Sequence, residues 1–115
     1  MRKRLIVSSR QLVATGPTLS AILRYCVGLA AAYQGPTVTA ILSGDAVRCA
    51  VKGSQRTSTD HLLLSAKAHF IEIWADRESL EAIRLSPEHL VEGVQVVSTE
   101  EILELWTNSD LQVSF

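Results

Sequence analysis

Apolar positions follow two different periods along this chain. From Leu19 to Tyr33 they recur every three or four residues, which is typical of one face of a helix. Short runs rich in β-branched residues are instead typical of buried strands. Such runs occur at Leu5–Val7, Thr37–Leu42, His69–Trp74 and Val94–Val97. Because strands alternate with helices, the pattern predicts a mostly parallel sheet with helices on both faces.

Turn-forming residues delimit the other predicted elements. Pro17 suits the first turn of the long helix, and Gly35-Pro36 ends it. Ser43-Gly44-Asp45 predicts a tight turn in which Asp45 caps a short helix. Ser98 and Glu101 have the spacing of a capping box ahead of a last helix. Further helical segments are expected at 60–67, 77–84 and 86–93, with a polar loop at 53–59.

The end of the chain predicts a fifth strand. Leu111, Val113 and Phe115 alternate with polar residues, as on a half-covered edge strand. With this strand the prediction is a three-layer α/β/α sandwich around a five-stranded sheet, in which residues 1–115 form a single domain.

Composition excludes several classes of protein. Hydrophobic residues make up 47% of the 115 positions and the formal net charge is −1, so the chain is not typical of a disordered protein. A balanced charge provides no basic field for phosphates, which argues against nucleic-acid binding. No apolar stretch approaches the roughly 20 residues of a membrane span, and Leu5–Val7 is too short for a signal sequence. We therefore expect a cytoplasmic protein that binds neither nucleic acid nor membrane.

Cysteines and histidines give no metal pattern. Cys26 and Cys49 lie far apart in sequence, and the three histidines form no helical pair, so no metal and no cofactor is predicted. Cys26 lies on the apolar face of the long helix and is expected in the core. Cys49 is expected to point away from the face formed by Val47, Ala50 and Val51. It would then pack in a subunit interface, remain an inert exposed thiol, or act as a redox thiol whose pKa is lowered by Arg48 and Lys52.

Three segments in a fixed order resemble one known family. Gly44-Asp45-Ala46-Val47 follows the second strand, Ile73-Trp74-Ala75-Asp76 closes the third, and residues 90–115 supply a closing strand, helix and strand. Together they resemble the DsrE/DsrF/TusD family of sulfur-relay proteins over nearly the whole chain. The resemblance implies a flavodoxin-like (DsrE-like) topology and assembly into dimers, trimers or hexamers.

The resemblance also implies where the chemistry would lie. Active members of the family carry a persulfide on a cysteine just after the third strand. Here the matching position is Asp76, or Ala75 if the register shifts by one, and neither residue can hold a persulfide. The chain is therefore identified as a member that lacks the persulfide cysteine.

Polar residues at the carboxyl ends of the strands are the candidate binding site. Parallel strands bring these ends to one edge of the sheet, where ligands bind in open α/β folds. The candidates are Ser9, Arg10, Gly44, Asp45, Trp74, Asp76 and Arg77. For Asp76 the alternatives are a ligand for a cation or amine and a plain helix cap. For Ser9 and Arg10 they are an anion site and a solvated loop.

The sequence favours a binding protein over an enzyme. We expect a non-catalytic, homo-oligomeric scaffolding protein, a trimer or hexamer, serving as an accessory subunit in intracellular sulfur relay. Its partners would include homologous subunits that carry the cysteine. The alternatives are a small-ligand-binding protein, for an anion or nucleotide, and sulfur transfer through Cys49.

Overall fold

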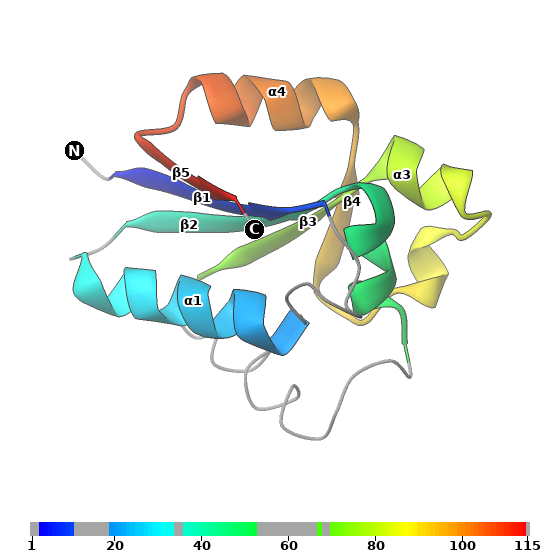
Figure 1. Ribbon diagram of the computed structural model, residues 1–115, viewed down its shortest axis with the longest axis horizontal. Helices are drawn as coiled ribbons and strands as arrows, with labels where there is room; N and C mark the ends of the chain where they lie inside the picture. The colour runs from blue at the N-terminus through cyan, green and yellow to red at the C-terminus, as the bar shows by residue number, and fades with distance from the viewer. Residues whose placement is uncertain (1–2, 11–18, 34–35, 53–66, 68–69, 115) are drawn as a thin grey trace.

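In the computed structural model, five parallel strands form one sheet between two helical layers (Figure 1). The structure describes residues 3–10, 19–33, 36–52, 67 and 70–114. The strands are β1 (Arg4–Ser9), β2 (Thr37–Leu42), β3 (Glu72–Asp76), β4 (Val94–Val97) and β5 (Leu111–Ser114). The helices are α1 (Leu19–Ala32), η1 (Gly44–Ala50), α3 (Arg77–Ala82), η2 (Pro87–His89) and α4 (Thr99–Thr107). The predicted α/β sandwich is confirmed.

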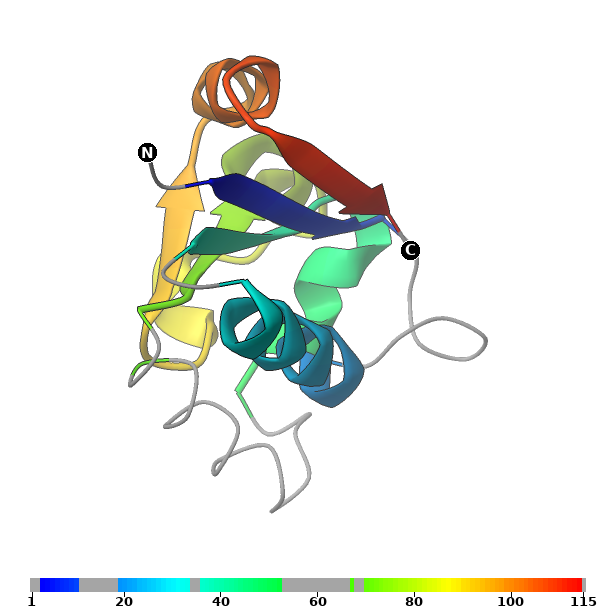
Figure 2. The ribbon, with the colours of Figure 1, turned by 90° about the vertical axis from the view of Figure 1, so that its left-hand side faces the viewer.

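The order of strands is β4-β3-β2-β1-β5, which makes β4 and β5 the edges. Every pair is parallel, so the carboxyl ends of the strands lie at the same edge of the sheet. This edge is at the right in Figure 1, where α3 and η1 lie. Viewed along the strands, α4 covers one face of the sheet and α1 the other (Figure 2).

The main core lies between the sheet and the layer of α1 and η1. Alternate residues of the strands point to this side, and they pack with the apolar stripe of α1. The cluster includes Leu5, Val7, Val38, Ala40, Ile22, Leu23 and Cys26, each at most 2% exposed. The opposite face is covered less completely, because no residue of α4 is fully buried.

Several predicted boundaries match the structure closely. β2 and β4 have the predicted bounds, and β5 is an edge strand as expected. The capping of α4 is confirmed, since Ser98 Oγ accepts a hydrogen bond of 3.2 Å from the Glu101 backbone N–H. Pro17, Gly35, the loop at 53–59, residues 60–66 of the predicted helix and Phe115 lie outside the described residues.

Two local predictions were wrong. The third strand begins at Glu72 because Phe70 has a φ of +57°, a left-handed conformation that does not continue a strand. Asp45 is not a cap: Ser43 holds the cap position without a side-chain hydrogen bond, and Asp45 is an exposed residue of the first turn. Among the described helices, none is both long enough and apolar enough to span a membrane.

Candidate functional site

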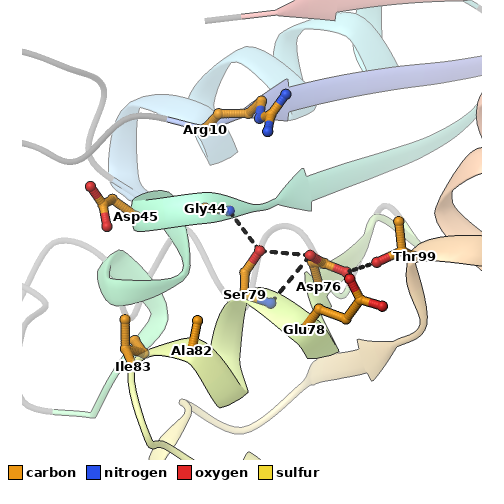
Figure 3. Close-up of a pocket in the computed structure, with 9 residues that line it drawn as sticks. All are labelled: Arg10, Gly44, Asp45, Asp76, Glu78, Ser79, Ala82, Ile83 and Thr99. Carbon is orange, nitrogen blue, oxygen red and sulfur yellow. Dashed lines mark hydrogen bonds between the residues drawn. The ribbon is translucent and has the colours of Figure 1, made fainter.

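A cleft of about 430 Å³ opens where the strands end (Figure 3). Its wall on one side is Arg10, directly after β1, and on the other side it is α3. The start of η1 and the first residue of α4 complete it. Its described lining residues are Arg10, Gly44, Asp45, Asp76, Glu78, Ser79, Ala82, Ile83 and Thr99. The volume lies within the range of small-molecule sites.

The carboxylate of Asp76 organises the floor of the cleft. Its Oδ2 accepts hydrogen bonds from the Ser79 hydroxyl at 2.6 Å and from the Ser79 backbone N–H at 3.3 Å. Its Oδ1 accepts a hydrogen bond of 2.8 Å from the Thr99 hydroxyl. Asp76 is only 7% exposed, so these bonds replace the water that the carboxylate loses on folding. The predicted cap of α3 is confirmed, and the same carboxylate also binds the start of α4.

The network continues into the start of η1. The Gly44 backbone N–H donates a hydrogen bond of 2.8 Å to Ser79 Oγ, which in turn donates to Asp76. Gly44 has a φ of +56°, and a Cβ atom at this position would lie 3.1 Å from the Arg10 carbonyl oxygen. A glycine is therefore required twice here, by the backbone conformation and by the close approach of the end of β1.

Three charged side chains surround this floor. Arg10, Asp45 and Glu78 are exposed, and none of their side chains has a hydrogen bond or ion pair within the described residues. In Figure 3 Arg10 lies across the cleft from Glu78. The cleft thus combines a rigid, internally bonded floor with charged groups that remain available to a ligand.

The structure brings together four of the seven residues predicted for this rim, namely Arg10, Gly44, Asp45 and Asp76. Ser9 is 1% exposed and lies among the strand residues that face the core, and its hydroxyl has no hydrogen-bond partner in the described part of the chain. Trp74 lies within β3, where its Nε1 donates to Glu72 Oε2 at 3.1 Å, and does not line the cleft. Arg77 is exposed outside it.

Sequence reasoning missed the lining residues Glu78, Ser79, Ala82, Ile83 and Thr99 as site residues. For Ser79 a signal existed, because the residue three positions after an N-cap donates its backbone N–H to that cap. Thr99 gave none: its contact with Asp76 depends on the pairing of β3 with β4, which aligns Asp76 with Val97.

Both cysteines are buried, and both thiols are poor nucleophiles. Burial raises the pKa of Cys26 and of Cys49 from 9.0 to about 12. The core position of Cys26 is confirmed. The expectation for Cys49 was wrong: it is 8% exposed and belongs to the core cluster with Ala46. The cause is that η1 is buried on two sides: Val47 and Ala50 form one buried row, and Ala46 and Cys49 form a second.

The described residues contain no cluster of metal-ligating side chains. The Nδ1 atom of His89 lies 3.0 Å from both the backbone nitrogen and the hydroxyl of Ser86, in a capping arrangement. His61 and His69 lie outside the described residues.

Comparison with known proteins identifies a family that the chain matches. The sequence profile of the DsrE/DsrF-like family matches residues 12–115. No curated protein sequence gives a match to the chain.

Solved structures share the whole fold. The ychN protein from E. coli superimposes with a TM-score of 0.81 at 19% identity, over 100% of both chains. MTH1491 from Methanobacterium thermoautotrophicum, a protein of unknown function, gives 0.81 at 15% identity over 98% of this chain and 99% of its own. BT1422 from Bacteroides thetaiotaomicron, also of unknown function, gives 0.70 at 15% identity over 98% and 95%. At such identities the likeness shows the fold.

Proposed function

The chain belongs to the DsrE/DsrF-like family, and from this premise we propose that it acts as a binding subunit that carries no sulfur on its own cysteines. In this role it would serve cytoplasmic sulfur relay as an accessory to homologous subunits that hold the reactive thiol.

The burial of both thiols carries this proposal. The sequence contains two cysteines, and each has a pKa raised to about 12 because the apolar core disfavours the thiolate. The thiolate is the nucleophile in sulfur transfer. At neutral pH neither cysteine provides it, and neither lines the cleft at the ends of the strands.

The residue at the family's sulfur position supports the same role. Asp76 ends β3 and begins α3, where the resemblance places the persulfide cysteine. Its carboxylate already accepts three hydrogen bonds from Ser79 and Thr99. The adjacent alternative, Ala75, is fully buried and has no reactive group. Asp76 therefore has a structural role in this chain.

Incubation with a cysteine desulfurase and its substrate tests the proposal. We expect no stoichiometric gain of a sulfur atom in the intact mass, because no thiolate is accessible. The same reaction with a cysteine-bearing family member is the positive control. A gain of one sulfur that disappears in Cys49→Ala would overturn the proposal and establish transfer through Cys49.

Self-association is the second part of the proposal. In α4 the apolar side chains Ile102, Leu105 and Trp106 are only half-buried, and Leu103 is 60% exposed. The edge strand β5 follows this helix in the chain, and its Leu111, which pairs with Leu5 and so faces the α1 side of the sheet, is 38% exposed. An uncovered apolar layer beside a free strand edge favours contact with another subunit. We expect a trimer or hexamer, either of this chain alone or with cysteine-bearing homologues.

A second candidate function is the binding of a small ligand in the cleft. The observation that favours it is a set of three charged side chains that have no hydrogen bond or ion pair in the described part of the chain and that surround a hydrogen-bonded polar floor. Such preorganised polar groups in a concave site are typical of ligand recognition.

A further inference from the structure

Charges of opposite sign line opposite sides of the cleft. Arg10 extends from the end of β1, and Glu78 lies on the α3 side (Figure 3). If these two groups paired with each other, the cleft would be closed by its own ion pair, yet no such pair forms. Both charges therefore remain available to a molecule that lies between them.

Among the described residues, the floor between them offers hydrogen-bond acceptors and no free side-chain donor. The Ser79 hydroxyl hydrogen is used by Asp76 Oδ2, and the Thr99 hydroxyl hydrogen by Asp76 Oδ1. The Gly44 N–H is used by Ser79 Oγ. What remains on these side chains is lone pairs, on the hydroxyl oxygens and on the carboxylate. A ligand group that lies on this floor must supply the hydrogens itself.

The charge of the described lining residues disfavours simple polyanions. The described lining residues include one basic side chain, Arg10, and three acidic ones, Asp45, Asp76 and Glu78. A phosphate or nucleotide drawn to Arg10 would meet these carboxylates, and repulsion between like charges costs affinity. The anion or nucleotide that the sequence allowed as an alternative ligand is thus disfavoured. At the far end of α3, Ala82 and Ile83 add an apolar wall.

We propose that the cleft binds a small zwitterion, a molecule with a protonated amine and a carboxylate close together on an aliphatic skeleton, as in an α-amino acid. The carboxylate pairs with the Arg10 guanidinium, whose planar fork suits two parallel hydrogen bonds. The three N–H groups of the ammonium point to Glu78 and to the floor of Ser79 and Asp76. This assignment rests on the proposed role of the cleft as a binding site and names its ligand class.

The test is an NMR titration of the full-length protein with each of the protein amino acids at millimolar concentration. We expect at least one to shift the amide signals of Gly44, Glu78 and Ser79. The best binder is then compared with two analogues of the same skeleton, the amine without the carboxylate and the acid without the amine. Each analogue should bind about tenfold more weakly or worse, because each loses one charge-assisted contact.

Two variants test whether Arg10 and Glu78 bind the ligand. Arg10→Gln and Glu78→Gln should each weaken binding of the amino acid about tenfold or more. Arg77→Gln and Glu81→Gln are matched controls, since both residues are exposed and neither lines the cleft. They should leave the affinity unchanged. Because all four side chains are exposed, the fold should tolerate each change.

Three results would overturn the proposal. These are no shift with any amino acid, equal binding by an amine or acid analogue, and equal losses in the control variants. None of them bears on the absence of sulfur loading, which is measured separately with the desulfurase. A failed ligand assignment would therefore leave the proposed non-catalytic role standing, and a positive sulfur-loading result would not alter the titration.

Discussion

Asp76 accepts side-chain hydrogen bonds from residues three and 23 positions further along the chain. The first of these was predictable, because an aspartate at the end of a strand commonly caps the next helix. The second was not, since Thr99 reaches Asp76 only through the parallel register of β3 and β4. Local spacing thus revealed the cap, whereas the larger network required the tertiary arrangement.

Asp76→Ala should lower the free energy of unfolding by about 3 kcal/mol, more than the loss of a cap alone. Removing the carboxylate leaves the part-buried hydroxyls of Ser79 and Thr99 without their acceptor. Urea unfolding measures the effect. Glu78→Ala, an exposed neighbour in the same helix, should change stability by about 0.5 kcal/mol or less. Equal losses in the two variants would show that the network contributes little.

Because its two thiols are buried, the protein should lose stability as the pH becomes alkaline. In the folded state their pKa values are about 12, above the ordinary value of 9.0, so the unfolded chain releases these protons first. Their contribution is complete below about pH 9 and is lost as the pH rises toward 12. Each thiol can account for a slope of about 1.4 kcal/mol per pH unit within that window.

Urea unfolding between pH 7.5 and pH 10.5 measures this slope. Lysines and tyrosines ionise in the same range, so Cys26→Ala with Cys49→Ala is the reference protein. The native protein should lose more stability than this variant between the two pH values. Parallel losses would mean that the thiols ionise as freely in the folded state as in the unfolded chain.

At the scale of elements, the sequence predicted what depends on burial and missed what depends on local backbone geometry. β2 and β4 are short runs rich in β-branched residues between turn-forming residues, so their bounds were correct. Residues 44–50 have a pattern that suits either helix type, and only the structure shows three residues per turn. The prediction for Cys49 was wrong because it assumed one buried face, whereas Ala46 and Cys49 form a second buried row. Similarly, the apolar character of Phe70 led to the prediction that it belongs to the third strand, whereas its positive φ excludes it from β3.

Gly44 and Gly28 allow a matched comparison of the same substitution in two different backbone settings. Gly44→Ala should cost about 2 kcal/mol, since a left-handed backbone is strained for alanine and its Cβ would press on the Arg10 carbonyl. Gly28 lies inside α1 with nothing within 4 Å of an added Cβ, so Gly28→Ala should stabilise by about 0.5–1 kcal/mol. Thermal unfolding compares them. A loss in both variants, or in neither, would show that the local backbone does not set the difference.

At the scale of the whole molecule, the two helical layers are unequal. The layer of α1 and η1 encloses the main core, whereas α4 contributes no fully buried residue. The fold class followed from the sequence because alternating strands and helices permit few arrangements. The unequal coverage did not, because the apolar pattern of residues 98–106 marks an inner face without showing how completely it is covered. That incomplete cover is the structural argument for assembly.

Charge placed on α4 or on the β5 edge should therefore dissociate the protein. Leu103→Lys places a charge on the exposed apolar surface of α4, and Leu111→Lys places one on the free edge strand β5, where its partner Leu5 shows that it faces the α1 side of the sheet. A subunit contact at either position would have to desolvate the charge. Sedimentation at micromolar concentration should show a trimer or hexamer for the native chain and smaller species for both variants. Ala31→Lys, at an exposed position of α1 on the side of the sheet opposite α4, should leave the assembly intact. A native chain that sediments as a monomer would refute self-association, and dissociation by Ala31→Lys alone would place the contact on α1.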